Sequence, residues 1–433
     1  MSDDDRARPG PAAGDGPQPA EGPLHGVHVL ELGNYIAAPT TGRLLADFGA
    51  DVIKVERPRT GDELRRWRLY AGDTSMLYRA INRGKRSIAV DLRSEEGREI
   101  VLDLIRRSDV LLENFRPGTL DGWGLDERTL QRVNPRLIVA RISAFGQTGP
   151  LAHRPGFAAV AEAYGGFREL VGEPGRPPSR TGVSIGDTIA GIYAAFGVVM
   201  SLFERERDGD GLSDGEGAEQ GRSGLDRRTI DVALNEAMLS VTESLVPEWE
   251  AYGIRRERTG GRMQGIAPSN AYLCGDGRSI VVAGNGDAIF HRYMSLIGRP
   301  ELGEDPALRS NEGRWEAREL LDDAIGEWTA ARTSEQALAE LEAAGVPSGP
   351  IYTAEDVCAD EQLAARGMIQ RFDVHDGERL REGVGFPGIV PVIGGVSRPI
   401  ASLGPDLGEH TREILGELGW SGPRIDAYEQ ETR

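Results

Sequence analysis

The sequence has little cysteine, little lysine and no long apolar run. Two cysteines, Cys274 and Cys358, in 433 residues argue against a disulfide framework and favour a reducing cytoplasm, where we expect the protein. Lysine occurs only at Lys54 and Lys85, so nearly every cationic group is a guanidinium. The most apolar stretch, 188–203, is shorter than the roughly 18 to 20 residues that span a bilayer, and we interpret it as a buried helix.

Other absences exclude classes of function. The formal net charge of -19 argues against a nucleic-acid binder, which needs clustered positive charge. None of the six histidines stands in a metal-ligand spacing, so no metal site is predicted. The chain has neither a Walker loop nor a Gly-x-Ser-x-Gly elbow. No Gly-x-Gly-x-x-Gly follows the first predicted strand, so NAD or FAD is not expected.

Short apolar segments alternate with amphipathic ones in the first half of the chain. This alternation predicts a parallel sheet covered on both faces, in a Rossmann-like, doubly wound α/β domain. Ligands of such a sheet gather at the carboxyl ends of its strands. Strands are predicted at 27–32, 51–55, 87–92, 109–112, 137–140 and 229–234, with helices at 40–48 and 95–107.

Composition shifts divide the chain into segments. Residues 1–23 are predicted to be a disordered tail, and 207–226 an acidic surface loop. The large domain is expected to cover 24–225, a linker containing a helix near 235–252 to cover 226–257, and a smaller α+β domain to cover 258–345. Residues 346–433 would form a second linker and return to the large domain. In the small domain we predict strands at 271–273 and 279–283 and helices at 287–297, 313–331 and 334–344.

Asp187 is the most informative single residue, because it is a lone carboxylate at the start of the apolar stretch. A charge beside so much apolar surface costs free energy unless it has partners. One interpretation is a helix N-cap, worth about 1 kcal/mol. The other is a nucleophile, because a helix N-terminus stabilises an ionised carboxylate and carboxylates serve in covalent catalysis. Spacing alone favours the N-cap and leaves the nucleophile as the alternative.

Several blocks, taken in order, give the chain a family resemblance. Over residues 24–425 it resembles the family III coenzyme A transferases (CaiB/BaiF family, formyl-CoA transferase and carnitine CoA-transferase type). The blocks that carry the resemblance are 26–32, 44–56, 82–92, 109–118, 154–157 and 182–187. Each block is weak alone, whereas their shared order and spacing are highly specific.

The resemblance implies a mechanism and a set of site residues. Asp187 would be the nucleophile, forming first a mixed anhydride with the donor acid and then an aspartyl-CoA thioester. CoA would be a substrate, and neither a metal nor a permanently bound cofactor would be required. The positions matching the family's CoA contacts are Arg57, Val90, Arg93, Asn114 and Phe115.

The chain also departs from the formyl-CoA transferase pattern. Ile36 stands where that enzyme has a glutamine near the reacting groups, and its glycine run is reduced to Gly260 and Gly261. Oxalate is therefore not expected as the acceptor. The blocks 265–272 and 283–290 are more similar to the branch that uses succinyl-CoA with malate or citramalate. A dicarboxylate acceptor would need an arginine partner, for which Arg262 is a candidate alongside a surface role.

Two alternative functions and a homodimeric assembly are also considered. An α-methylacyl-CoA racemase shares the fold but needs a histidine where this chain has Phe157, and a non-catalytic CoA-binding protein would have lost the nucleophile. Because members of the family form interlocked dimers, a homodimer is expected. Its wrapping segments would be the linkers near 226–257 and 346–370.

Overall fold

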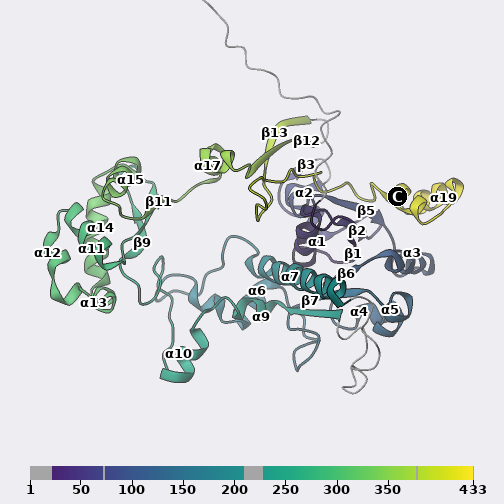
Figure 1. Ribbon diagram of the computed structural model, residues 1–433, viewed down its shortest axis with the longest axis horizontal. Helices are drawn as coiled ribbons and strands as arrows, with labels where there is room; N and C mark the ends of the chain where they lie inside the picture. Colours follow the sequence, from purple (N-terminus) through teal and green to yellow (C-terminus); the bar gives the residue numbers. More distant parts are fainter. Residues whose placement is uncertain (1–21, 72–73, 209–227, 377–378, 433) are drawn as a thin grey trace, which may run out of the picture. The chain divides into compact units, whose positions relative to one another are not determined.

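The computed structural model describes residues 22–71, 74–208, 228–376 and 379–432 (Figure 1). Almost all of the predicted tail 1–23 and of the predicted acidic loop 207–226 lies outside these residues. The chain forms two compact units. The first unit comprises Met1–Arg141, Ala194–Ile230 and Arg366–Arg433, and the second comprises Ile142–Tyr193 and Asp231–Ala365.

A six-stranded sheet with the order β5-β2-β1-β6-β7-β8 organises the first unit. The four contacts that join β5, β2, β1, β6 and β7 are all parallel. The predicted α/β, doubly wound fold is therefore confirmed. The strands are β1 His28–Glu31, β2 Asp51–Glu56, β5 Lys85–Ala89, β6 Val110–Glu113, β7 Ile138–Ser143 and β8 Thr229–Ala233.

Both faces of this sheet are covered, as the apolar strands require. Along β1, Val29 joins one buried cluster and the next residue, Leu30, joins another. The same alternation separates Leu111 from Val110 in β6. Successive side chains of a strand point to opposite faces, so the two clusters are two cores with the sheet between them. The helices of this unit include α1 Ala37–Asp47, α3 Glu95–Arg107, α5 Glu127–Val133, α18 Thr411–Glu417 and α19 Gly422–Thr432.

Helix α3 shows why these segments become helical. The Ser94 hydroxyl accepts a hydrogen bond from the Gly97 amide and so caps the helix start. Acidic residues occupy the first turn and arginines the last, which matches the helix dipole. Its apolar residues, spaced three and four apart, are buried. The helix has the bounds predicted from the sequence.

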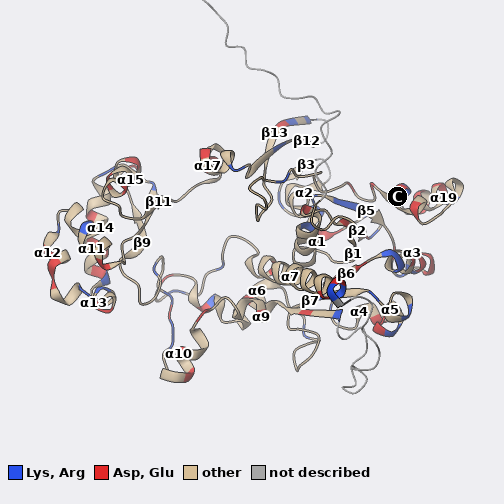
Figure 2. Ribbon diagram, viewed as in Figure 1, with Lys and Arg blue, Asp and Glu red and all other residues tan. Residues whose placement is uncertain are grey.

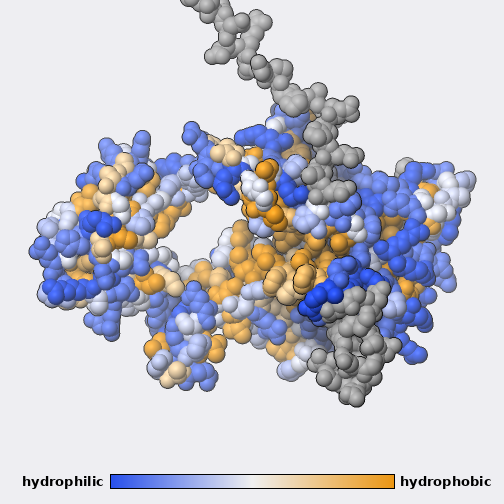
Figure 3. Space-filling view, viewed as in Figure 1, coloured by the Kyte–Doolittle hydropathy of each residue, from blue (hydrophilic) through white to orange (hydrophobic). Residues whose placement is uncertain are grey.

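Helix α7, Ile185–Asp208, is longer and more exposed than predicted. The 188–203 stretch was interpreted as a buried helix too short for a membrane, but the helix extends beyond it at both ends. Residues 185–207 meet the length and hydropathy expected of a membrane span, with 44% of the most apolar window buried. This is weak evidence for a span, because a core helix passes the same test. Figure 2 shows few charges along α7 before its last turns, and Figure 3 shows hydrophobic surface there.

The second unit contains a three-stranded antiparallel sheet, β11-β10-β9. Helices α11, α14 and α15 pack around it in one buried cluster that includes Ile280, Tyr293 and Leu321. The strands are β9 Ser269–Leu273, β10 Ser279–Ala283 and β11 Ser348–Pro350; the helices are α11 Asp287–Leu296, α14 Arg318–Ala330 and α15 Ser334–Ala343. The unit also contains α6 Ala158–Tyr164, which packs on α9 Leu234–Leu239.

Two of the helices predicted from the sequence are each divided into two helices in the structure. The helix expected at 235–252 is two helices, α9 and α10 Leu245–Tyr252, because the Ser240 and Thr242 hydroxyls donate back to carbonyls of the preceding turn and Glu243 has a φ of 56°. The helix expected at 313–331 is likewise divided at Ala317 into α13 Asn311–Glu316 and α14.

The division of the chain also differs from the predicted domain boundaries. Residues 142–193, expected in the large domain 24–225, group with residues 231–365. The return to the first unit begins at Arg366, near the end of the second linker predicted at 346–370. The remaining elements are β3 Tyr70–Ala71, β4 Thr74–Ser75, β12 Ile369–Asp376, β13 Arg379–Pro387, η1 Glu63–Arg66, η2 Phe167–Leu170, η4 Pro306–Leu308, α2 Met76–Ile81, α4 Thr119–Gly122, α12 Pro300–Glu304, α16 Ala354–Ala359 and α17 Glu361–Ala365.

Candidate active site

A cavity of about 430 Å³ lies at the carboxyl ends of β1, β2, β5 and β6 in the first unit. Its walls come from the segments that follow these four strands, between Leu32 and Trp123. Strand order reverses here, because β1 lies between β2 and β6. In an open parallel sheet this switch point is where ligands bind.

Four of the five predicted CoA contacts meet at this cavity. Arg57, Val90, Arg93 and Phe115 line it. Asn114 does not, but it holds the loop after β1: the Asn34 amide donates to Asn114 Oδ1 at 2.9 Å, and Asn114 Nδ2 donates to the Asn34 carbonyl at 2.7 Å. The structure therefore brings these residues together around one cavity.

Close approach of the β1 and β6 ends depends on Gly33. A Cβ at this position would lie 2.4 Å from Ala38 Cβ and 2.9 Å from Asn114 Oδ1. Real Cβ atoms essentially never lie closer than 3.0 Å to another heavy atom, so both contacts would force a neighbour to shift. Glycine at position 33 therefore lets Asn34 reach both Asn114 and the cavity wall.

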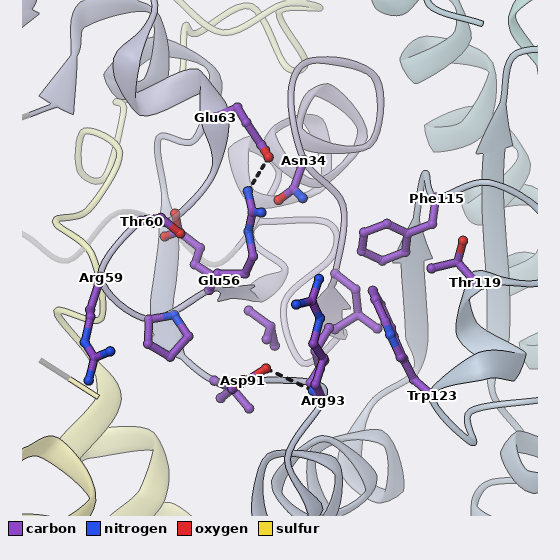
Figure 4. Close-up of a pocket in the computed structure, with 16 residues that line it drawn as sticks. Asn34, Glu56, Arg59, Thr60, Glu63, Asp91, Arg93, Phe115, Thr119 and Trp123 are labelled. Carbon is purple, nitrogen blue, oxygen red and sulfur yellow. Dashed lines mark hydrogen bonds and ion pairs between the residues drawn. The ribbon is translucent and has the colours of Figure 1, made fainter. Parts of the chain in front are cut away.

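An aromatic wall of the cavity was missed by sequence reasoning. The rings of Phe115 and Trp123 pack edge to face, with centroids 5.0 Å apart. Figure 4 shows both rings beside Thr119, with Arg59 on the opposite side. Trp123 lies between two glycines in the sequence, and a large ring in such a setting is the signal that was available.

Charged groups edge the cavity. The Arg57 guanidinium pairs with Glu63, and Arg59 Nη2 donates to the Glu431 carbonyl at 3.0 Å. Arg93 is exposed, and its backbone amide donates to Asp91 Oδ1 at 3.0 Å (Figure 4). Arginines around an aromatic wall suit a ligand that combines phosphates with a flat ring.

Buried ion pairs support the loops of the cavity. Lys54 Nζ lies 3.0 Å from Glu31 Oε1 and 3.0 Å from Asp62 Oδ2, and it donates to the Gly33 carbonyl at 2.6 Å. All three charged side chains are fully buried. Asp62 Oδ1 in turn accepts from the Tyr35 amide at 3.0 Å. The network thus ties the loop after β1 to the segment after β2.

Glu56 has the most complete set of partners in this region. Its two oxygens accept hydrogen bonds from Arg65 at 2.7 and 2.8 Å, and from Tyr78 and Ser87 at 2.8 and 2.6 Å. Burial alone would raise the pKa of Glu56. Hydrogen bonds and charge from Arg65, together with the charge of Lys54, outweigh burial and lower this pKa to about 2.

Asp187 lies in the second unit, in the first turn of α7. The helix begins at Ile185, so the interpretation of Asp187 as the N-cap is wrong. The Thr188 amide already bonds the Ser184 carbonyl, at 3.1 Å. Burial, then the charge of Glu162, raise the pKa of Asp187 to about 6, and Arg180 opposes them.

Glu162, the carboxylate near Asp187, was not predicted. It lies on α6 and is 1% exposed. Its sequence signal was present, because it is the only charge in the apolar segment 157–164. The lone carboxylate in an apolar stretch that drew attention to Asp187 occurs here a second time.

Ile36, a predicted substrate residue of the first unit, does not line the cavity, and the other predicted substrate residues belong to the second unit. Ile36 is 5% exposed and packs with Leu64 and Tyr78, so it is a core residue. In the second unit, the Gly260 amide donates to the Gly172 carbonyl at 3.0 Å. Arg262 Nε lies 2.5 Å from Asp322 Oδ2, so its charge is already paired.

Gly261 is closely packed, since a Cβ there would lie 2.5 Å from Asn270 Oδ1. Among the described residues, no group of three or more His, Cys, Asp or Glu side chains is placed to hold a metal ion. Phe157, at the position where a racemase has its histidine, is 68% exposed.

Comparison with known proteins gives a consistent result. Residues 24–411 match the sequence profile of the family described as CoA-transferase family III. The chain is 42% identical over 398 residues to a succinyl-CoA–D-citramalate CoA-transferase of Chloroflexus aurantiacus, covering 92% of this chain and 94% of that protein. It is 36% identical over 400 residues to the β subunit of a succinyl-CoA–L-malate CoA-transferase of the same organism, with 92% and 94% covered.

A solved structure agrees with the sequence comparisons. The crystal structure of a CaiB/BaiF family protein from Brucella suis superimposes with a TM-score of 0.77 at 35% identity, covering 92% of this chain and all of that one. The relatives carry transferase names, and the racemase alternative is not favoured.

Proposed function

Because the chain belongs to CoA-transferase family III and is a CoA-transferase, we propose that it moves CoA from succinyl-CoA to a dicarboxylic acid through acyl intermediates on Asp187. The relatives named for succinyl-CoA with citramalate or malate support this substrate class. The observation that carries the mechanism is the Asp187 carboxylate, which is poorly solvated, has a pKa raised to about 6 and is therefore ionised at neutral pH.

Transfer takes place in two exchanges that mirror each other. An Asp187 Oδ attacks the thioester carbonyl carbon of succinyl-CoA, the C–S bond breaks, and the sulfur leaves with the electron pair as CoA thiolate. The thiolate then attacks the Asp187 carbonyl carbon of the mixed anhydride and releases succinate. The acceptor carboxylate attacks the resulting aspartyl thioester, and the released thiolate attacks the acceptor acyl carbon. Asp187 is thereby regenerated without net oxidation or consumption of water.

We place the nucleotide end of CoA in the cavity of the first unit. The Phe115–Trp123 wall offers a stacking surface for adenine, and Val90 supplies an apolar neighbour. Arg57 and Arg93 are the candidates for the phosphates. Asn114 would act by holding Asn34 at the cavity wall.

A dicarboxylate acceptor needs a cationic partner for its second carboxylate. Arg262, beside Gly260 and Gly261 in the sequence, is the candidate partner of an acceptor carboxylate. That carboxylate would compete with Asp322 for the Arg262 guanidinium. Because one methylene in an acyl pocket changes binding by only about 1–3 kcal/mol, a screen of dicarboxylic acids against succinyl-CoA is needed to rank acceptors.

Replacement of the nucleophile tests the mechanism. We expect Asp187→Ala to lower the rate of CoA transfer by at least about 10⁴-fold while succinyl-CoA still binds. Asp323→Ala, which removes an exposed carboxylate of the same unit, is the matched control and should retain activity. Hydroxylamine added during turnover should modify Asp187, located by peptide mass spectrometry. Turnover in Asp187→Ala would contradict the mechanism.

We further propose that a second copy of this chain covers the apolar face of α7, in the interlocked homodimer predicted above. Phe196, Val199, Met200 and Phe203 are all more than 40% exposed on this helix, and an exposed apolar face of this kind marks an interaction site. Sedimentation at micromolar concentration should give a dimer. Phe203→Glu should weaken it, whereas Leu320→Glu, at an exposed leucine of α14, should not. A monomeric wild-type protein would refute the proposal.

A cytoplasmic location is the accompanying expectation. Both cysteines are free thiols, with Cys274 buried and Cys358 exposed. A thiol that remains reduced fits a reducing compartment. Fractionation of cells that express the full chain would test it.

A further inference from the structure

The buried carboxylate of Glu162 has only half of the partners that it needs. Arg168 Nη2, from η2, lies 3.0 Å from Glu162 Oε2. Oε1 is buried and has no hydrogen-bond partner among the described residues. Burying a carboxylate usually requires that both oxygens be satisfied.

The first turn of α7 packs against the side chain of Glu162. A Cβ at Gly186 would lie 3.5 Å from Glu162 Cγ and 3.4 Å from Met238 Sδ. Because position 186 is a glycine, no side chain there separates α6 from the first turn of α7. Asp187 is the next residue in this turn. Two carboxylates of the second unit are thus brought close together, with the Arg168 guanidinium on one of them.

The known charges around Asp187 are few. Glu162 of α6 raises its pKa and Arg180, from the segment before α7, lowers it. Arg168 acts through its ion pair with Glu162. Glu162 therefore brings a negative charge to a carboxylate whose environment already disfavours ionisation through burial.

Building on the proposed role of Asp187 as nucleophile, we propose that Glu162 and Arg168 form a positioning pair that makes Asp187 reactive. Arg168 holds the Glu162 side chain in place through their ion pair, and the negative charge of Glu162 repels the Asp187 carboxylate. When Asp187 attacks the thioester, the C–S bond breaks and the charge leaves with the CoA sulfur. The acylated Asp187 is neutral, so the repulsion is relieved as each covalent intermediate forms.

The two members of the pair should have opposite effects on pH dependence. Glu162→Gln removes the negative charge, so the acid limb of the kcat profile for succinyl-CoA-dependent transfer should move to lower pH by about 0.5 to 1 unit. Arg168→Met removes the positive charge that partly offsets Glu162, so the acid limb should move to higher pH. At pH 8 we expect kcat of Glu162→Gln to fall about 3- to 30-fold, with the KM for succinyl-CoA changed less than 2-fold.

Two further variants separate charge from packing. Glu162→Asp retains the negative charge and should keep the acid limb within about 0.3 units of the wild type. Glu169→Gln removes an exposed carboxylate of η2 that pairs with Arg258 and should leave the profile unchanged. A general loss of packing would lower activity in both pair variants without moving their acid limbs in opposite directions. Unchanged acid limbs in Glu162→Gln and Arg168→Met would overturn the proposal.

A measurement independent of activity distinguishes this inference from the proposed function. Urea unfolding at pH 8 should show that Asp187→Asn stabilises the wild type more than it stabilises Glu162→Gln, because the repulsion is already absent there. Equal gains in both backgrounds would overturn the pair even if Asp187→Ala abolishes transfer. Unequal gains together with transfer by Asp187→Ala would show that the two charges interact but that Asp187 is not the nucleophile, and both proposals would then fail.

Discussion

Glu56 in the first unit is fully buried and Asp187 in the second is half-buried, and the charged groups next to the two carboxylates have opposite signs. Glu56 accepts hydrogen bonds from Arg65, Tyr78 and Ser87, and its pKa falls to about 2. Asp187 has the carboxylate of Glu162 as a neighbour, and its pKa rises to about 6. Burial opposes ionisation in both cases, so the partners decide which carboxylate is held as a stable anion and which is left reactive.

The comparison extends to the two units as wholes. The first unit surrounds its buried charges with opposite charges and presents a cavity for a ligand. The second unit leaves Asp187 and Glu162 short of partners. A carboxylate that lacks compensating charges or hydrogen bonds lowers the stability of the fold and is more reactive, and such groups are common at functional sites. We therefore expect variants of the first unit to change stability and binding, and variants around Asp187 to change chemistry.

The largest effect should follow from breaking the partners of Glu56. Arg65→Met leaves a fully buried carboxylate without its guanidinium, and we expect the free energy of unfolding to fall by about 3–5 kcal/mol in urea titrations at pH 7. Arg412→Met removes an exposed arginine that pairs with Glu429 at 2.9 Å and should cost much less stability, because exposed ion pairs are weak. Equal losses in the two variants would erase the contrast between the buried and the exposed pair.

A change of opposite sign is expected at Asp187. A folded-state pKa raised above the unfolded value means that stability is present at low pH and is lost as pH rises through about 6. Asp187→Asn should therefore raise the free energy of unfolding by about 1–3 kcal/mol at pH 8. The gain should vanish near pH 4, where the wild-type side chain is protonated in the folded protein. A destabilised Asp187→Asn protein at pH 8 would contradict this reading of its environment.

Removing the aromatic wall should affect binding without affecting chemistry. Trp123→Ala deletes the partner of Phe115, and we expect the KM for succinyl-CoA to rise about 5- to 30-fold, equivalent to about 1–2 kcal/mol. Trp123→Phe should recover most of the loss. Steady-state kinetics at pH 8 should leave kcat within about 2-fold of the wild type. A fall in kcat with KM unchanged would contradict the assignment of CoA binding to the first unit and of chemistry to the second.

The smallest effect is expected at the exposed edge of the cavity. Arg93→Gln should raise the KM for succinyl-CoA by about 2- to 5-fold at low ionic strength, because exposed charge contacts are weak. The difference should shrink as salt is added, since screening weakens the wild-type contact as well. A salt-independent effect of Arg93→Gln would indicate a buried contact instead.

Much of the first unit could be predicted because its periodicities are local. Helix α3 has the predicted bounds, and the six strands of the parallel sheet, β1, β2, β5, β6, β7 and β8, lie within a few residues of their predicted positions. The break at Ser240 to Ser244 was missed, because hydroxyl back-bonding and a positive φ at Glu243 interrupt an otherwise helical pattern. The break at Ala317 was missed as well. The boundary at residue 142 depends on contacts between distant segments, which periodicity does not report.

The candidate site divides in the same way. Arg57, Val90, Arg93 and Phe115 follow strand ends, and the topology of a parallel sheet carries such positions to one edge. Trp123 lies on a turn after β6, and its approach to Phe115 depends on the local path of the chain. Glu162 and Asp187 are 25 positions apart, and only the packing of α6 against α7 reveals that they interact.

The core of the first unit combines segments from the beginning and from the end of the chain, which are synthesised at different times. Its core contains Ile414, Leu415, Ile425 and Tyr428, and the Tyr428 hydroxyl donates to the Ala89 carbonyl at 2.9 Å. These residues are translated long after β1 and β2, with residues 142–365 made largely for the other unit in between. At about 5–20 residues per second, translating residues 142–365 alone takes roughly 11 to 45 seconds, and α18 and α19 follow only after them. During that interval one apolar face of the sheet lacks its final cover, so binding of a chaperone to the nascent chain should be strongest before residue 411 emerges.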